Sequence, residues 1–179
     1  MSEKTLSSRI VFDGRALRLR VDTVMTDNGR TTMREIVEHP NCVAVVAIDT
    51  INNIVLVKQY RKSVEKELLE IPAGGIETGE TPVEAVEREM REETGLQPKT
   101  VEHIGGFYSS PGFCTEYLHL YLATDLVPKP LVAEDTEGIQ LVTVPPEQIP
   151  VLINSGTICD AKSIAGLLQY LYLYKNNKK

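Results

Sequence analysis

The sequence lacks the features that mark membrane proteins and secreted proteins. None of its apolar runs approaches the ~20 residues that a membrane-spanning helix needs. The N-terminal stretch "MSEKTLSSRI" is polar and contains no apolar segment that could serve as a signal peptide. We therefore expect a cytoplasmic protein without a membrane partner.

Clustered basic residues are also missing. The 179 residues carry a net charge of −6, and the one basic cluster is the terminal "KNNKK". Binding of nucleic acid depends on grouped lysine and arginine side chains that neutralise phosphates, so nucleic acid is not expected as a partner. An acidic protein that handles phosphate groups would need cations as intermediaries.

Cysteine and histidine are scarce, with three of each. Cys42, Cys114 and Cys159 are widely spaced and form no CxxC pair, so the sequence indicates neither structural zinc nor dithiol chemistry. The histidines are equally scattered, and a Cys–His nucleophile is disfavoured. We expect the cysteines to be reduced and structural.

The residues that are present predict strands first. With 42% hydrophobic and 25% charged residues, the chain has the composition of a globular protein with one domain or one domain and a small appendage. Residues 17–25 alternate apolar and polar, Asn28–Gly29 predicts a hairpin, and residues 33–40 return as its second strand. Further strands are expected at residues 43–48, 54–58, 119–124 and 139–144.

Helices are fewer. The clearest begins at Thr81, which acts as N-cap, with Pro82 in the first turn and Glu84 completing a capping box; it ends at Gly95. Two more helices are expected at residues 146–154 and, with Asp160 as cap, 161–174.

The order of these elements predicts an α/β (α+β) fold. Residues 1–40 are expected to form a small N-terminal antiparallel sheet. Residues 41–179 are expected to form a mixed-sheet sandwich with helices on both faces.

Residues 82–94 form an unusually acidic helix. Glu89, Glu92 and Glu93 stand at i, i+3 and i+4, so their side chains converge on one sector. The apolar stripe beside them, expected to face the sheet, consists of Val83, Val86 and Met90. Converging carboxylates repel one another unless cations bind, and hard oxygen ligands suit Mg²⁺ or Mn²⁺. The alternative is a solvated charged face, with Arg88 offsetting part of the repulsion.

The preceding residues favour the metal. From Gly74 the chain has five residues, Glu80, seven residues and then "REMREETGL" at 88–96, which resembles the Nudix box of the Nudix hydrolases at every fixed position. The resemblance implies hydrolysis of a nucleoside diphosphate linked to another group. It also implies that Glu89, Glu93 and the Ala73 carbonyl bind metal.

The resemblance implies roles for the rest of the box. Glu92 is expected as a further ligand, or as a catalytic contact to a water on the metal. A structural role is implied for four residues of the motif: Gly74, Glu80, Arg88 and Gly95.

Flanking residues resemble the ADP-ribose pyrophosphatases, notably "VKQYRK" at 57–62 and "YSSPGFCTE" at 108–116. This resemblance implies Pro111, Gly112 and Arg61 as substrate contacts. It also implies a homodimer that exchanges its N-terminal sheet and supplies Arg34 from the partner chain. Pro111–Gly112 as a plain turn and Arg34 as an exposed strand arginine stay open.

The segment "VAEDTEGIQL" at 132–141 resembles the family's base loop, which makes Glu137 the expected general base and Glu134 the second candidate. The sequence has no tryptophan to stack on adenine, and Met33 stands where the family often has an aromatic. We therefore expect a Mg²⁺-dependent ADP-ribose pyrophosphatase. Another nucleoside diphosphate sugar such as GDP-mannose, or a nucleotide-sensing module, is the alternative.

Overall fold

The computed structural model describes residues 2–133 and 137–175. Contacts within the chain divide it into two compact units. The first unit comprises Met1–Asn41 and Tyr108–Tyr117, and the second comprises Cys42–Phe107 and Leu118–Lys179. Each unit is described by itself.

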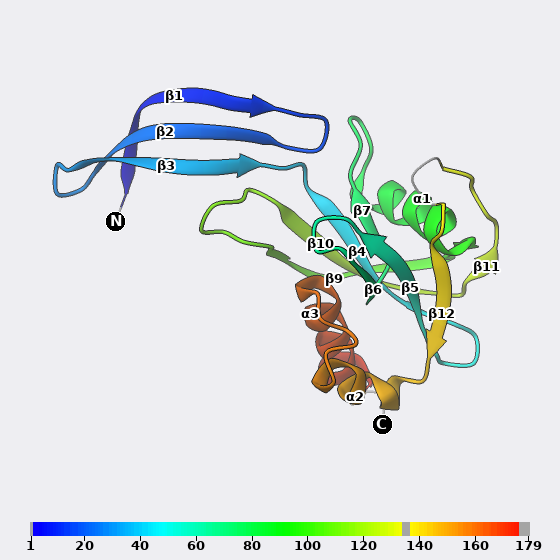
Figure 1. The fold of residues 1–179 in the computed structure, drawn as a ribbon. Helices are drawn as coiled ribbons and strands as arrows, with labels where there is room; N and C mark the ends of the chain where they lie inside the picture. Colours follow the sequence, from blue (N-terminus) through cyan, green and yellow to red (C-terminus); the bar gives the residue numbers. More distant parts are fainter. Residues whose placement is uncertain (1, 134–136, 176–179) are drawn as a thin grey trace. The chain divides into compact units, whose positions relative to one another are not determined.

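The first unit contains an antiparallel sheet in the order β1-β2-β3 (Figure 1). Its strands are β1 (Glu3–Asp13), β2 (Arg18–Thr26) and β3 (Thr31–Glu38). The predicted hairpin between β2 and β3 is confirmed, because Gly29 takes the left-handed φ of 78° and donates its N–H to Thr26 O. Strand β1 was not predicted, since "EKTLSSRI" has little apolar alternation.

The segment Tyr108–Tyr117 belongs to the same unit through backbone hydrogen bonds along β3. Val37 donates its N–H to Phe113 O at 2.7 Å, and Thr115 donates to Val37 O at 2.9 Å. Just before these contacts the chain turns at Pro111 and Gly112, both exposed.

The second unit is built on a mixed sheet of seven strands with the path β12-β5-β4-β10-β9, where β6 pairs with β5 and β7 with β4. Strand β10 runs parallel to β4, and β5 and β7 run antiparallel to it. The strands are β4 (Cys42–Ile48), β5 (Ile54–Arg61), β6 (Lys66–Glu70), β7 (Ala73–Gly75), β9 (Thr100–Tyr108), β10 (Tyr117–Thr124) and β12 (Gln140–Val144). A two-stranded sheet pairs β8 (Leu96–Gln97) with β11 (Val127–Pro128).

Strand β4 lies at the centre because both of its faces are apolar. Its alternate residues enter two core clusters, one with α1 (Pro82–Thr94) and one with α2 (Ile149–Asn154) and α3 (Ala161–Gln169). The helices therefore cover both faces of the sheet, as predicted (Figure 1). The first cluster contains Val43, Val45, Ala47, Ala85, Val86 and Met90, and the second contains Ala44, Val46, Ile48, Ile149 and Leu167.

Helix α1 has the predicted ends. Thr81 N–H donates to Glu84 Oε2 at 2.8 Å, Glu84 N–H donates to Thr81 Oγ1 at 3.3 Å, and Gly95 closes the helix with a φ of 74°. This capping box fixes where the acidic turns that follow begin.

The predicted apolar stripe of α1 was wrong at one position. Val83 is 43% exposed, whereas Ala85 is fully buried together with Val86 and Met90. At roughly 100° per residue, Glu89 and Glu93 project between Ala85 and Met90, inside the buried sector. The carboxylates thus lie within the packed face of the helix, and the centre of that face is rotated away from Val83.

The C-terminal helices follow the prediction closely. A 3₁₀ turn at Pro146–Gln148 leads into α2, and Asp160 caps α3 by accepting a hydrogen bond from Ser163 N–H at 3.1 Å. Helix α3 continues as π-helix over Tyr170–Lys175. Within residues 2–133 and 137–175, no helix has the length and apolarity needed to cross a membrane. Cys42, Cys114 and Cys159 form no disulfide bond.

Candidate functional site

The site lies where α1 packs against β7. A Cβ atom on Gly74 would lie 1.9 Å from Oε1 and 2.4 Å from Oε2 of Glu89, far inside any tolerated contact. Only a glycine at position 74 therefore lets the Glu89 carboxylate lie against the backbone of β7. The sequence pattern of a glycine before an acidic helix has a direct steric cause.

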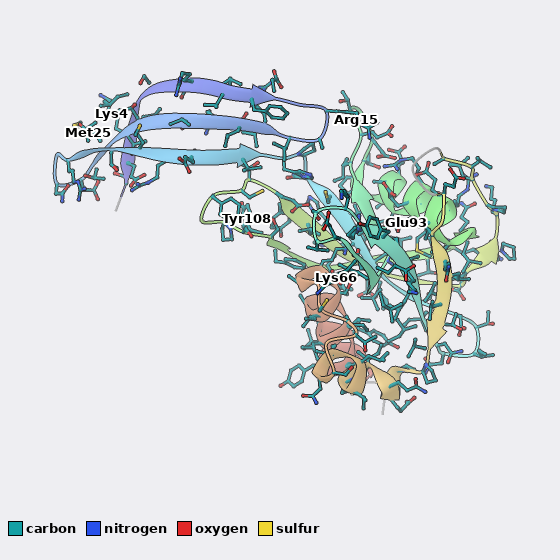
Figure 2. The ribbon with its side chains drawn as sticks, in the orientation of Figure 1. Lys4, Arg15, Met25, Lys66, Glu93 and Tyr108 are labelled. Atoms are coloured by element: carbon teal, nitrogen blue, oxygen red, sulfur yellow. The ribbon has the colours of Figure 1, made fainter. Side chains whose placement is uncertain are left out.

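Glu93 lies against the same strand, and Figure 2 labels its side chain beside α1. Its Oε2 accepts a hydrogen bond from Ala73 N–H at 3.0 Å, and its Oε1 accepts one from Gln59 Nε2 at 3.5 Å. Burial above all, together with the neighbouring Glu89, raises the pKa of Glu93 to about 7 against the opposing effects of the Ala73 hydrogen bond, Arg61 and Lys162. Ionised Glu93 is therefore costly in this site without a nearby cation.

Arg88 connects the acidic side chains. Its Nε and Nη2 donate to the Glu80 carboxylate at 2.8 and 2.9 Å, and Nη2 also donates to Gly75 O at 2.7 Å. Its Nη1 donates to Glu89 Oε1 at 2.6 Å and to Glu92 Oε2 at 3.2 Å. The hydrogen bond from Arg88 lowers the pKa of Glu80, so this carboxylate stays ionised and holds the guanidinium.

The donor set fits a hard divalent cation. Burial raises the pKa of Glu89 in spite of its hydrogen bond to Arg88, as burial does for Glu93. Glu89 and Glu93 are partly buried carboxyls that resist ionisation. Together with Glu92, which bonds to Arg88, and the Ala73 backbone beside Glu93, they offer oxygen ligands of the kind that Mg²⁺ and Mn²⁺ prefer. A cation there would favour their ionised forms.

Arg61 lies in a charged network that the sequence did not reveal. Its Nε and Nη2 donate to Glu70 Oε1 and Oε2 at 3.0 and 2.6 Å. Lys162 Nζ from α3 reaches the same Oε2 at 2.5 Å. Glu70 is 1% exposed; its burial acts to raise its pKa, but Arg61 and Lys162 outweigh that effect and lower it. The sequence signal for this network was a glutamate at the end of the strand "KELLE". No neighbouring residue indicated that its partner would be Lys162 on α3.

Arg34, Pro111 and Gly112 belong to the first unit. Arg34 pairs with Glu3, its Nη2 lying 2.5 Å from Oε1, and it is exposed. The substrate contacts expected of these three residues stay predictions.

The candidate bases fall on the segment before β12. Glu137 is exposed in a turn three residues before Gln140, where that strand begins. Glu134 lies outside the described residues. Which carboxylate acts as base stays a prediction.

Comparisons with known proteins agree with the motif. The family description "NUDIX domain" matches residues 38–167. The chain is 42% identical over 173 residues to a "Methanol dehydrogenase activator" of Bacillus methanolicus, covering 96% of this chain and 93% of that protein. It is 39% identical over 175 residues to an "ADP-ribose pyrophosphatase" of Bacillus subtilis (strain 168), covering 97% and 94%.

A solved structure shares the fold. It is described as an "ADP compounds hydrolase" and matches with a TM-score of 0.90 at 21% identity, covering 99% of this chain and 97% of that one. The likeness includes both units of the chain, and at this identity it supports the architecture alone.

Proposed function

Because the chain belongs to the NUDIX family, we propose that it catalyses Mg²⁺-dependent hydrolysis of the pyrophosphate bond of ADP-ribose, giving AMP and ribose 5-phosphate. The observation that carries the proposal is the pair of partly buried carboxyls, Glu89 and Glu93, packed on the Ala73–Gly74 backbone. The 39% identical relative named as an ADP-ribose pyrophosphatase supports the substrate.

The residues that would hold the cation are Glu89, Glu92, Glu93 and the Ala73 carbonyl, and Mn²⁺ suits the same donors. When bound, a divalent cation offsets the negative charges of the diphosphate and acidifies water. Arg88 fixes two of these carboxylates, so their geometry does not depend on the substrate.

The side chains of the chain do the positioning. Arg61 orients the diphosphate, since its Nη1 makes no hydrogen bond to the part of the chain that the structure describes. Glu137, or Glu134 in its place, accepts a proton from the attacking water. The water oxygen bonds to one phosphorus, the bridging P–O bond breaks, and the leaving phosphate takes the electron pair.

We include in the proposal a homodimer formed through the first unit. All eleven residues of β1 are exposed, including Leu6, Ile10 and Phe12, which a single chain leaves uncovered. β1 is also an edge strand. Light scattering after size exclusion is expected to give twice the mass of one chain, and a monomer at micromolar concentration would contradict the dimer. Supply of Arg34 by the partner and a cytoplasmic location stay predictions.

The test of activity is a substrate panel. We would incubate the protein with Mg²⁺ and ADP-ribose, GDP-mannose, NADH, dinucleoside polyphosphates or nucleoside triphosphates, and separate the products by chromatography. AMP and ribose 5-phosphate from ADP-ribose, absent with EDTA, are expected in excess of any other product. Preferred cleavage of GDP-mannose would replace the substrate but keep the site. No cleavage with Mg²⁺, or with Mn²⁺ in its place, would favour a nucleotide-sensing role.

A second candidate function comes from the relative at 42% identity, which is named as a methanol dehydrogenase activator. Under this proposal the chain raises the rate of a methanol dehydrogenase. The rate of that enzyme would be measured with the wild-type chain and with Glu93→Gln. An increase with both proteins would indicate activation by binding, and an increase with wild type alone would indicate activation by hydrolysis. No increase with either would reject this candidate.

A further inference from the structure

Four charged side chains of the second unit alternate in sign. Asp160 Oδ2 lies 2.8 Å from Lys162 Nζ, which lies 2.5 Å from Glu70 Oε2. The same Oε2 accepts from Arg61 Nη2 at 2.6 Å. One carboxylate oxygen thus serves two cations, one from α3 and one from β5.

Sharing changes the charge that Arg61 presents. If Glu70 bonded Arg61 alone, the full negative charge of the carboxylate would offset the guanidinium. Because Lys162 draws on the same oxygen, Glu70 offsets less of the Arg61 charge, while Asp160 offsets part of the Lys162 charge in turn. The Arg61 side chain is also the more accessible of the two cations, 38% exposed against 15% for Lys162.

The end of this chain of charges lies at the candidate cation site. Gln59 and Arg61 stand two residues apart on β5, so both side chains leave the same face of the strand, and Gln59 Nε2 donates to Glu93 Oε1 at 3.5 Å. An anion bound beside Glu93 would meet the uncompensated part of the Arg61 charge. Diphosphate is such an anion, and a guanidinium matches its oxygens in bidentate geometry.

The first turn of α3 also holds the backbone of this region. Ser163 is fully buried, and its Oγ accepts a hydrogen bond from Ile71 N–H at 2.9 Å. Lys162 and Ser163 therefore hold two consecutive residues, Glu70 and Ile71, just before β7, which begins at Ala73. This anchoring fixes the backbone that carries Glu70.

We propose that Lys162 is a positioning residue for diphosphate binding, acting through Glu70 on the charge and orientation of Arg61. The inference rests on the proposed function in that it takes a diphosphate to bind beside Glu93. Lys162 itself does not contact the reacting atoms. Without the Lys162 ammonium, Glu70 pairs with Arg61 alone. The stronger ion pair then holds the guanidinium away from the ligand and offsets more of its positive charge.

The test uses Lys162→Gln, which removes the charge and keeps a hydrogen-bond donor for Glu70. The matched control is Lys58→Gln on β5, whose lysine pairs at 2.7 Å with the exposed Glu67. With ADP-ribose and saturating Mg²⁺, we expect Lys162→Gln to raise KM about tenfold and to change kcat less than about twofold. Lys58→Gln should change both by less than about twofold, and Lys162→Arg should restore KM to within about threefold of wild type.

A double variant shows whether Lys162 acts through Arg61. In an Arg61→Gln background, Lys162→Gln is expected to raise KM by less than about a further twofold. A full additional tenfold rise would overturn the proposal. So would a fall in kcat and in melting temperature at unchanged KM, which is the signature of a merely structural role, because a smaller folded fraction does not alter affinity.

Binding of ADP separates this inference from the proposed function. If the wild-type chain does not cleave ADP-ribose, the proposed function fails, and calorimetry with ADP on the same variants still tests Lys162. About tenfold weaker ADP binding by Lys162→Gln, with Lys58→Gln unchanged, would support the inference. Equal binding by all variants, or no ADP binding by the wild type, would overturn it.

Discussion

Strand β4 of the second unit buries all seven of its residues, whereas strand β1 of the first unit exposes all eleven. Helices on both faces of the second sheet cover β4. In the three strands of the first unit, the buried residues are Asp22 and Val24, both on β2. Burial is what makes side-chain identity matter. The chain therefore concentrates its structural constraints in the second unit and leaves the apolar side chains of β1 available to a second molecule.

A matched pair of substitutions tests this comparison directly and has the largest expected effect. Val45→Asp places a carboxylate in a fully buried strand and is expected to lower the free energy of unfolding by more than about 4 kcal/mol. Ile10→Asp on β1, where the side chain is 46% exposed, should change the stability of a monomer by less than about 0.5 kcal/mol. Urea titration measures both. Similar losses in the two variants would break the comparison.

Ile10→Asp also tests the proposed dimer. The same aspartate that a single chain tolerates would lose its hydration in an interface that covers β1, so light scattering is expected to show monomers. A variant that stays dimeric would place the interface elsewhere.

Glu93→Gln has the next largest expected effect, and it changes a partly buried carboxyl that the proposed function assigns to the metal site. The amide is a poor metal ligand, so kcat for ADP-ribose is expected to fall at least about 100-fold. The fold should survive, because glutamine avoids the burial of a charge. Glu87→Gln on the same helix is the control and should retain activity. Full activity of Glu93→Gln would reject the assigned ligand set.

Gly74→Ala tests the close approach of α1 to β7. The added methyl would overlap the Glu89 carboxylate, so we expect a loss of about 2 kcal/mol in the free energy of unfolding and a large loss of activity. Gly75→Ala is the control, because its Cβ would meet no atom within 4 Å. Thermal unfolding of the two variants compares them. Equal stability would mean that Glu89 moves aside at no cost.

Glu70→Gln has the smallest expected effect and a defined pH dependence. The pKa of Glu70 is lowered in the fold, so its contribution to stability is present above the ordinary value of 4.5 and is lost as the pH falls below it. At pH 7 we expect the variant to lose about 2 kcal/mol, discounted for the partial exposure of Arg61. The difference from wild type should shrink between pH 4.5 and lower pH in urea titrations. A constant difference would show that the ion pairs are not its source.

Local signals in the sequence identified most of the second unit. The cap at Thr81, the end at Gly95 and the central apolar strands are encoded by neighbouring residues, and each appears in the structure where it was expected. The convergence of Glu89 and Glu93 also follows from helical spacing alone.

Local sequence signals did not predict three features of the structure. Val83 was wrongly assigned to the buried face of α1. Periodicity gives the width of an apolar stripe, but it does not specify which residue lies at the centre of the buried face. Strand β1 has polar alternation too weak to distinguish it from loop. The contact of Lys162 with Glu70 joins residues 92 positions apart, which no local pattern specifies.

The sequence by itself determined the helix caps, the hairpin at Gly29, the apolar character of β4 and the acidic motif, because each depends on residues within a few positions of one another. Tertiary structure alone decided that the Glu89 carboxylate lies on the Gly74 backbone, that Glu93 is buried enough to raise its pKa to about 7, and that Lys162 and Arg61 share Glu70. Desolvation and charge pairing depend on which distant segments pack together, and packing is a property of the folded chain.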